Sequence, residues 1–475
     1  MNTACIRTSI EDEVLREIKP READYEKVSS TYKLVREAVA SFLHMHDAAH
    51  EVELSLEGSF AKDTWLRDDV DLDIFLLAKR DCSRYASHTF IEKLAEFLAA
   101  RGFRVEQRYA QHPYLTLVVN ELEVDVVPAC SIEDPARPLT AVDRTPYHRR
   151  YVTSKLVAEQ KDEVRLLKSF MKGIGVYGAE VSVKGFSGYV AELLVVFYGC
   201  FRKVLEAASS WRPPVVIDIE GYYSSRREVL EKFGKAPVIV VDPTDPNRNA
   251  AAAVSIKSLA SFVMASKLYL RNPSIEFFHI ARRGEEDSIP RLEDLNQRVQ
   301  NVVLVEVAVQ ERIPRDNLWG ILDRIRRIAT NILENEGFRV FDSGTYLDDT
   351  GVRGIIAIEV EQETLPPYEK LKGPPPWSEP GASQFYEKYT KTEPDSIGPW
   401  IDHDGRLVVI RRRRHRRASE TLTARLPSAL PKSAQSLRIK VGTLKEALQG
   451  GLTHGEAKWL REFIAKAPKW IRKDA

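Results

Sequence analysis

Residues 58–77 read GSFAKDTWLRDDVDLDIFLL. The alternation that begins at Val70 predicts a strand over 70–79, and successive side chains of a strand point to opposite faces. Asp71 and Asp73 therefore share one face of this strand, while apolar residues fill the other. An ionised carboxylate is costly to bury unless a cation or hydrogen-bond donors compensate it. The two carboxylates therefore predict a cationic partner beside this strand.

A second predicted strand carries a third carboxylate. In LEVDVVP (122–128), Asp125 points away from the face that the leucine and valines at even positions share. If the two strands are neighbours in one sheet, three carboxylates converge. Ligand sets made only of oxygen suit a hard cation such as Mg²⁺, which keeps several waters and is completed by substrate phosphates. We therefore expect metal ions and a nucleoside triphosphate here, with an ordinary surface strand as the alternative.

The Gly58-Ser59 pair precedes a short helix that we expect to begin at Ser59. The first N–H groups of a helix have no partner within the helix and can bind phosphate. Serine is also a common helix cap, so the pair alone has an ordinary structural explanation. The order of Gly-Ser, helical turn and acidic strand is a rarer combination than any of its parts.

Overall charge and cysteine spacing restrict the class of protein. The formal net charge of the 475 residues is +1, so local rather than overall charge has to identify a nucleic-acid binder. The four cysteines are widely separated and form no Cys-x-x-Cys pair, which argues against a zinc site or a disulfide scaffold and suits a reducing cytosol. They are Cys5, Cys82, Cys130 and Cys200.

Neither the N-terminal residues nor the longest apolar stretch indicates a membrane protein. The N-terminal residues are charged and contain no apolar core of a signal peptide. The longest apolar stretch, 189–201, contains Glu192 and is too short to span a bilayer, so it predicts a buried helix. We expect a cytoplasmic protein.

The remaining patterns predict an α+β multidomain chain. An amphipathic helix over 10–45 breaks near Pro20, and a hairpin turn falls at Asn120-Glu121. The proline-rich segment 364–381 is expected to be a long loop or linker. The other predicted elements are a helix over 87–102, three strands within 103–129, helices after Pro146, a strand, turn and helix start over 236–254, and a strand–helix–strand–strand series at 301–310, 315–336, 338–347 and 352–362.

The stretch 58–77 resembles the signature of the polymerase-beta-like nucleotidyltransferase superfamily, which includes poly(A) polymerases. The resemblance is more specific to the archaeal (class I) CCA-adding tRNA nucleotidyltransferases and extends over roughly residues 40–265. It continues, in order, through QHPYLTLVVNELEVDVVPA (111–129), AVDRTPYHRRYV (141–152), DEVRLLKSFMKGIGVYGAE (162–180), VKGFSGYVAELLVVFYG (183–199) and VVDPTDPNRNAAAAVS (240–255).

This resemblance implies an enzyme that adds C, C and A to the 3′ end of tRNA from CTP and ATP, without a nucleic-acid template. It implies that Asp71, Asp73 and Asp125 are catalytic and hold two Mg²⁺ ions. Asp125 would help to hold the ion nearer the tRNA 3′-hydroxyl. One metal ion can lower the pKa of that hydroxyl while the other stabilises the leaving pyrophosphate.

The resemblance also implies a set of nucleotide-binding residues. Ser59 would contact the β- and γ-phosphates, and Arg248 would help to read the base edge. Lys62 stands where the family typically has arginine, and lysine cannot make the bidentate contact of a guanidinium group. A solvated lysine at 62, an exposed cationic helix face at 168, a core tyrosine at 177 and a capping arginine at 248 remain the alternatives. The full set is Ser59, Lys62, His112, Thr145, His148, Lys168, Tyr177 and Arg248.

The RNA partner needs a basic surface, and the clearest basic run is IRRRRHRR (410–417). Arginines bind phosphates and make affinity depend on salt, although a solvated strand edge is the usual explanation of such a run. The candidate RNA-binding residues are Arg411, Arg412, Arg413 and Arg414.

The resemblance divides the chain into a nucleotidyltransferase head (1–145), a helical neck (146–275), and a body and tail (276–475) that hold the tRNA acceptor stem. It leaves a homodimer open. Two other functions also remain open: a poly(A) polymerase or oligoadenylate synthase of the same superfamily, and an RNA-binding protein whose catalytic site has decayed. Nucleotide choice separates the first from a CCA-adding enzyme, and any activity excludes the second.

Overall fold

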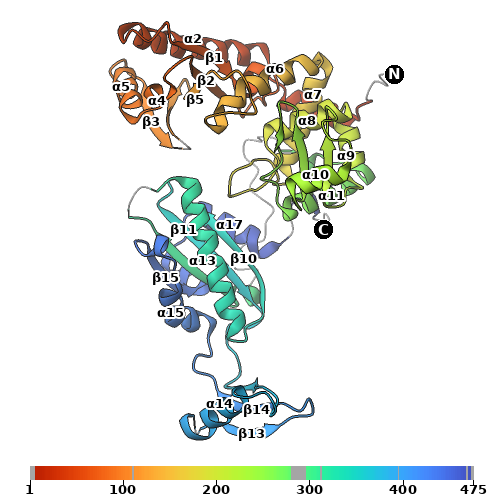
Figure 1. Cartoon of the computed structure of the whole chain (residues 1–475), viewed down its shortest axis with the longest axis vertical. Helices are drawn as coiled ribbons and strands as arrows, with labels where there is room; N and C mark the ends of the chain where they lie inside the picture. Colours follow the sequence, from red (N-terminus) through yellow and green to blue (C-terminus); the bar gives the residue numbers. More distant parts are fainter. Residues whose placement is uncertain are drawn as a thin grey trace. The chain divides into compact units, whose positions relative to one another are not determined.

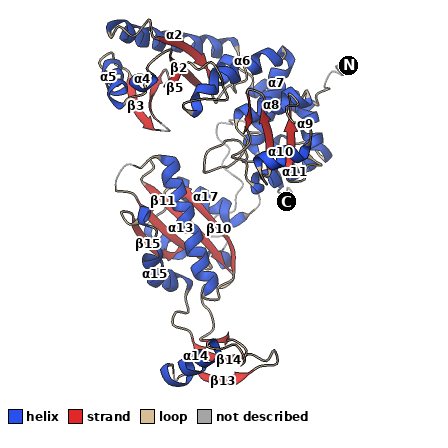
Figure 2. Ribbon diagram, in the orientation of Figure 1, coloured by secondary structure: helices blue, strands red, loops and turns tan. Residues whose placement is uncertain are grey.

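The computed structural model describes residues 6–109, 112–279, 296–310, 313–393, 395–466 and 469–471. Its contacts divide the chain into two compact units, residues 1–285 with 468–475 and residues 286–467. Figure 1 follows the chain by colour, and Figure 2 shows its helices and strands. Each unit has its own sheets and its own hydrophobic clusters.

The first unit begins with two helices on either side of Pro20, as predicted: α1 (Ser9–Ile18), which packs in the hydrophobic cluster of the later helices of this unit, and α2 (Glu22–Met45). A five-stranded sheet follows, in the order β1-β2-β5-β4-β3, and only β2 and β5 run parallel. Its strands are β1 (Val52–Glu57), β2 (Asp71–Ala78), β3 (Arg104–Tyr109), β4 (Pro113–Val119) and β5 (Leu122–Cys130). The short helices α3 (Gly58–Lys62) and α4 (Cys82–Tyr85), the longer α5 (His88–Ala99) and the 3₁₀ turn η1 (Ala141–Arg144) connect them.

Alternation in β2 and β5 gives the sheet one apolar face. Leu72, Ile74, Val124 and Val126 are fully buried in one cluster with residues of α2 and α5. The β4–β5 turn is the predicted one, because Asn120 and Glu121 both have positive φ (51° and 66°), as a two-residue hairpin requires. The helices therefore cover one face of the sheet, and the aspartates of β2 and β5 lie on the other.

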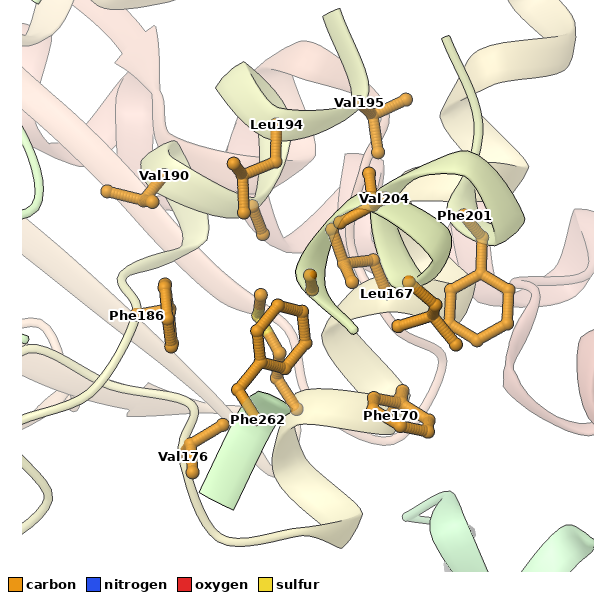
Figure 3. Packing of buried hydrophobic residues seen from close by; sticks show 14 of the residues in the cluster. Leu167, Phe170, Val176, Phe186, Val190, Leu194, Val195, Phe201, Val204 and Phe262 are labelled. Atoms are coloured by element: carbon orange, nitrogen blue, oxygen red, sulfur yellow. The ribbon is translucent and has the colours of Figure 1, made fainter. Parts of the chain in front are cut away.

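The part of the first unit built on the five-stranded sheet is called the head below, and the part from residue 145 to residue 279 is called the neck. The neck is a helical bundle with a small sheet against it. Figure 3 shows Phe170 of α7, Leu194 of α8 and Phe262 of α11 directed into the common core of the bundle. The apolar stretch that contains Glu192 is α8, and it is buried as predicted. Among the residues that the structure describes, no helix is long and apolar enough to cross a membrane. The helices are α6 (Thr145–Lys155), α7 (Ala158–Gly173), α8 (Gly188–Tyr198), α9 (Phe201–Ala208), α10 (Arg226–Phe233), α11 (Ile256–Arg271) and the 3₁₀ turn η2 (Ile275–Phe277).

The small sheet of the neck, β6-β7-β8, differs from the sequence prediction. β6 (Val215–Asp218), β7 (Val238–Asp242) and β8 (Asp245–Asn249) form it, and the last two make a hairpin. We expected a turn and then a helix start within the alanine-rich stretch, and this prediction is wrong. The helix begins only at Ile256, because the side chain of Ser255 caps its first turn. Arg248 consequently lies on a strand.

The second unit contains the predicted strand–helix–strand–strand series as β9 (Val302–Ala308), α13 (Arg315–Asn335), β10 (Val340–Leu347) and β11 (Arg353–Val360). A further strand, β15 (Arg438–Thr443), completes a four-stranded sheet in the order β10-β11-β9-β15. The apolar side of α13 packs on this sheet. Helices α12 (Asn296–Val299), α15 (Ala418–Ala429), α16 (Leu444–Gly450) and α17 (His454–Ala465) and the 3₁₀ turn η5 (Lys432–Ala434) complete this part, while the short turn η6 (Lys469–Ile471) belongs to the first unit.

A three-stranded sheet, β12-β14-β13, occupies the segment between β11 and α15. Part of the proline-rich stretch 364–381 is therefore strand rather than loop. Its prolines flank YEKLK, so the N–H groups of β12 (Tyr368–Lys372) stay available for pairing. β13 (Ile397–Ile401) and β14 (Leu407–Arg412) form the predicted hairpin around Asp404-Gly405, and α14 (Gly381–Glu387) with the short helix η4 (Lys388–Thr392) precedes it.

The cysteine spacing argued against a disulfide scaffold, but it did not predict that two of the cysteines are paired. Cys82 and Cys130 form a disulfide, with Cα atoms 5.5 Å apart. The parallel register places Ala78 beside Cys130, and Cys82 follows Ala78 by four residues. A separation of 48 residues thus hides a contact that the sheet makes close. The cysteine spacing consequently gives no support to a reducing compartment.

Arg165 of α7 connects the neck to the head. Its side chain is 2% exposed and donates to the carbonyl oxygens of Trp65 (3.0 Å) and Asp63 (2.8 Å), to the hydroxyl of Tyr25 (3.2 Å) and to the Asp63 carboxylate. It also pairs with Asp162 at 2.9 Å. Breaking a buried ion pair leaves an uncompensated charge and costs more than losing a surface pair.

We therefore expect Arg165→Ala to destabilise the first unit by about 3 kcal/mol, because two carbonyl groups lose a donor and the carboxylates of Asp63 and Asp162 each lose one of their cations. The matched control is Arg227→Ala, which removes an exposed helical ion pair with Glu231 and should cost less than about 1 kcal/mol. Differential scanning calorimetry of both variants measures the difference. Equal shifts in the two variants would show that Arg165 contributes no more than a surface arginine.

Candidate active site

Four side chains form a row across the open face of the head sheet. Backbone pairing places Glu57 of β1 beside Asp73 of β2, Asp73 beside Asp125 of β5, and Asp125 beside Thr116 of β4. Residues paired across strands point to the same face. Asp71 lies two residues before Asp73 on β2 and therefore points to the same face. The structure therefore brings the three predicted aspartates to one face of one sheet.

Gly58 allows the carboxylate of Asp73 to lie against the chain that leaves β1. It has φ of +73°, which favours glycine, and a Cβ atom there would lie 1.8 Å from Oδ2 of Asp73. The glycine of the Gly-Ser pair is thus required by the close approach of the central carboxylate. Ser59 follows in α3, a helix of only five residues, so this helix can offer N–H groups to a phosphate but little dipole.

Burial and neighbouring acidic side chains raise the pKa of each of the three aspartates. Burial, then the charges of Asp125 and Asp71, raise the pKa of Asp73 to about 7, and Lys62 only partly opposes this. Burial is also the largest cause of the raised pKa of Asp71 and of Asp125, although the Thr116 hydroxyl donates to Asp125. The protein's own cations therefore leave this group of carboxylates under-compensated. An all-oxygen donor set with this need fits a hard divalent cation.

The present positions of the side chains limit how these carboxylates could bind a metal ion. Among the described residues, no three His, Cys, Asp or Glu side chains stand close enough together to hold one metal ion. The backbone register already places Asp73 beside Asp125, and the charge of Asp71 raises the pKa of both. We infer that rotation of these side chains, without a change of strand pairing, is needed to gather them around a cation.

Lys62 and Lys168 meet at the buried carboxylate of Glu192. Oε2 of Glu192 accepts from Lys62 at 2.6 Å, and Oε1 accepts from the Thr64 hydroxyl at 2.6 Å and from Lys168 at 3.3 Å. Lys168 also donates to the carbonyl and hydroxyl oxygens of Thr64, both at 3.0 Å. The side chains of the two lysines are 10% and 2% exposed, so neither is a solvated surface lysine. Burial lowers the pKa of Lys168 to about 8, against the pull of Glu192.

Tyr177 lies beside this lysine pair. A Cβ atom at Gly188 would lie 2.8 Å from the Tyr177 hydroxyl and 3.7 Å from Nζ of Lys168, so the glycine makes room for both groups. The ammonium group of Lys172 stands 5.1 Å from the centre of the Tyr177 ring. Three of the predicted nucleotide-binding residues, Lys62, Lys168 and Tyr177, therefore belong to one neighbourhood.

His148 and Arg248 meet at a second buried carboxylate, that of Asp242. His148 Nε2 lies 3.1 Å from Oδ2 of Asp242, and Arg248 donates to the same oxygen at 2.6 Å. The His148 ring stacks on Tyr189 with centroids 4.0 Å apart. Lys62 stands 6.0 Å from the centre of the Tyr189 ring, so this cluster adjoins the lysine pair. Arg248 is 35% exposed and can present its remaining N–H groups to a ligand.

Two predicted nucleotide-binding residues are not brought into these clusters by any described contact. His112 stands before β4 and contacts the carbonyl of its neighbour Pro113 at 3.4 Å. Thr145 begins α6, one helical turn before His148, and is half-buried. Their predicted roles stay predictions.

The four candidate RNA-binding arginines lie in the second unit and alternate in role. Arg411 and Arg413 both pair with Glu369 of β12, at 2.8 and 2.9 Å. Arg412 and Arg414 are exposed, Arg414 to 77%, although Arg414 also pairs with Glu393 at 3.5 Å. Two of the four arginines are therefore exposed enough to reach RNA phosphates.

Three acidic residues of the site were missed by the sequence reasoning. Glu57 pairs with Arg149 at 3.0 Å, while Glu192 and Asp242 organise the two clusters above. A single glutamate within the apolar stretch 189–201 is a signal that could have found Glu192, because a buried charge needs a partner. The partners of the other two residues depend on long-range pairing.

Comparison with known proteins gives three family models that follow one another along the chain. "Nucleotidyltransferase domain" matches residues 35–148, "tRNA nucleotidyltransferase, second domain" matches 162–279, and "CCA-adding enzyme, C-terminal domain" matches 299–436. The CCA-adding enzyme of Saccharolobus shibatae is 36% identical over 464 residues, which are 98% of this chain and 100% of that one. The CCA-adding enzyme of Pyrobaculum islandicum is 41% identical over 416 residues, 86% of this chain and 92% of that one.

Among solved structures, the Cid1 poly(U) polymerase matches 56% of this chain and 94% of its own, with 18% identity and a TM-score of 0.44. This likeness is too weak to carry an argument.

The raised pKa of Asp73 predicts how stability depends on pH when divalent cations are removed by EDTA. Because the folded pKa of about 7 exceeds the usual value near 4, the favourable contribution of the protonated group is complete below about pH 4 and is lost as pH rises towards 7. Asp73→Asn lacks this group. Its melting temperature in EDTA should therefore gain on the natural protein between pH 4.5 and 7 and gain no more above pH 8.

Mg²⁺ at pH 8 should raise the melting temperature of the natural protein more than that of Asp73→Asn, because the cation compensates the ionised carboxylate. Asp134→Asn, an exposed carboxylate in the same head, is the control. A difference between Asp73→Asn and the natural protein that does not vary with pH would contradict the raised pKa.

Proposed function

Because the chain belongs to the family of CCA-adding enzymes, we propose that it adds C, C and A to the 3′ end of tRNA from CTP and ATP. It is a nucleotidyltransferase, and enzymes of this kind use nucleotides and divalent metal ions. The observation that carries the proposal is the row of under-compensated carboxylates beside two buried lysines. Negative side chains would hold the cations, and positive side chains would hold the triphosphate.

The reaction is a phosphoryl transfer. The tRNA 3′-hydroxyl gives up its proton to solvent and its oxygen forms a bond to the α-phosphorus of the nucleotide. The bond from the α-phosphorus to the oxygen that bridges to the β-phosphorus breaks, and pyrophosphate leaves. Asp71, Asp73 and Asp125 would hold two Mg²⁺ ions, which lower the pKa of the attacking hydroxyl and stabilise the leaving group. The hydroxyl of Thr116 donates to one carboxylate oxygen of Asp125, and the other oxygen of Asp125 would remain available to a cation.

Lys62 would bind the triphosphate, and Lys168, whose three N–H groups are all engaged by Thr64 and Glu192, would join it by exchanging one of these hydrogen bonds. Glu192 holds both ammonium groups in place, so they bind without first being ordered. A point charge suffices here, and lysine at 62 in place of the family's arginine gives up only the bidentate contact. The Tyr177 hydroxyl and Ser59 would add neutral donors, while His148 and Arg248 would face the base and ribose.

tRNA is the partner that this function requires, and the exposed arginines of the second unit would bind its phosphates. Binding of the acceptor stem by the body and tail, a cytoplasmic location and a homodimer as an assembly belong to the same proposal. The division of the chain into head, neck, and body with tail is also part of this proposal.

The function is tested by extending a tRNA transcript that lacks CCA, in Mg²⁺, with CTP, ATP, both or neither. We expect two C residues with CTP alone and one further A only when ATP is present. Asp125→Ala should reduce addition by at least about a thousandfold, because it removes a metal ligand, and should leave tRNA binding largely intact. Asp134→Ala is the control.

A ladder of A residues alone would indicate a poly(A) polymerase or an oligoadenylate synthase. tRNA binding without any product would indicate a decayed enzyme. Full activity of Asp125→Ala would contradict the site assignment.

The RNA surface is tested by the salt dependence of tRNA binding. Replacing Arg412 and Arg414 together by glutamine should reduce the slope of log affinity against log salt by up to about 1.8, because each phosphate contact on a duplex such as the acceptor stem contributes about 0.9. Replacing Arg411 and Arg413 should change the slope less, because Glu369 neutralises them. An unchanged slope in the first pair would remove these arginines from the interface.

A further inference from the structure

Asp242, at the end of β7, gathers donors from three other parts of the neck. Its side chain is fully buried. Oδ2 accepts from Arg248 of β8 at 2.6 Å and from His148 of α6 at 3.1 Å. Oδ1 accepts from the Tyr189 hydroxyl of α8 at 3.0 Å and from both the N–H and the hydroxyl of Thr244, at 2.9 and 2.8 Å. Both oxygens are therefore fully engaged.

These contacts keep Asp242 ionised. Burial raises the pKa of its carboxyl, but the hydrogen bond and charge of His148, the Thr244 N–H and the charge of Arg248 outweigh burial and hold that pKa below its usual range. An ionised carboxylate only accepts hydrogen bonds, so His148 Nε2 must carry a proton. In the neutral ring, Nδ1 is then left as an acceptor. One buried charge thus fixes the orientation of His148 and the position of Arg248.

We propose that Asp242 is a positioning residue for nucleobase selection, which holds Arg248 and His148 at the incoming base. This inference rests on the proposed function, in which these two residues face the nucleotide. The guanidinium group is anchored at one nitrogen and partly open at the others. Asp242 would touch no part of the substrate and would act only through the residues that it holds.

The chemistry of the bases gives the reason. Cytosine and adenine each present a ring-nitrogen acceptor beside an amino group on the pairing edge, whereas uracil and guanine present an N–H beside a carbonyl. Arginine can only donate. A guanidinium group in a fixed place therefore favours the ring-nitrogen acceptor and meets an N–H in the wrong bases. A guanidinium group that can move is able to reach the carbonyl instead, so loss of Asp242 should weaken the discrimination.

The same hairpin provides a matched control in Asp245. It is 1% exposed, pairs with Arg144 at 2.8 Å and accepts from the Asn247 N–H at 3.0 Å. It has no described contact with His148 or Arg248. Replacing either aspartate by asparagine removes one buried charge from the β7–β8 hairpin, and only Asp242→Asn frees the two base-facing residues.

The experiment compares kcat and KM for addition of one nucleotide from CTP and from UTP to the tRNA transcript lacking CCA. Asp242→Asn should raise KM for CTP and reduce the CTP-to-UTP ratio of kcat/KM about tenfold, the effect of losing one charged hydrogen bond. Asp245→Asn should keep the ratio of the natural protein. Affinity for tRNA should be the same in all three proteins.

A milder variant covers the case in which Asp242→Asn does not fold. Tyr189→Phe removes one donor to Asp242 and keeps the ring stacked on His148, and should lower the ratio about threefold. An unchanged ratio in the variants that fold, or an equal fall in Asp245→Asn, would overturn the inference. If the natural protein added no nucleotide, the proposed function would fail and the inference with it. Normal addition with unchanged selection in the variants would overturn the inference alone.

Discussion

The carboxylate of Asp73 lies in a sheet, against the backbone of Gly58 and between two other acidic strands. Burying negative charge at this density is unfavourable unless positive charge lies next to it. Much of the surrounding structure supplies that charge in part. Lys62 of α3 partly opposes the raised pKa of Asp73, and Arg149 pairs with the buried Glu57 beside it. Several contacts between head and neck are thus contacts between carboxylates and cations.

The sequence predicted those parts of the site that depend on local periodicity. Alternation alone placed Asp71 and Asp73 on one face and Asp125 on the corresponding face of another strand, and the structure confirms both. The turn at Asn120-Glu121 also followed from neighbouring residues, because asparagine tolerates positive φ. The sequence did not establish that β2 pairs with β5, because the two strands lie about fifty residues apart in the chain.

The features that were missed all depend on contacts distant in sequence. The disulfide between Cys82 and Cys130 follows from the register of a parallel pair. Arg248 was expected before a helix, but pairing with β7 makes its segment a strand and turns the arginine towards Asp242. Composition could not reveal that two of the four arginines at 411–414 meet Glu369, because that contact requires the pairing of β12 with β14. Local sequence patterns determine where the helices and strands form, whereas contacts between distant residues depend on how the strands pair.

Six carboxylates of the first unit, which differ in exposure, divide into two groups by the direction in which their surroundings move the pKa. Burial raises the pKa in every case, but nearby donors and cations outweigh burial at Asp63, Glu192 and Asp242 and lower it. These acids are satisfied by the chain itself, and their role is to hold cationic side chains in place. At Asp71, Asp73 and Asp125 burial and mutual repulsion prevail, and the pKa is raised. Only this second group needs a cation that the chain does not supply, which distinguishes the acids that would bind metal ions from those that position their neighbours.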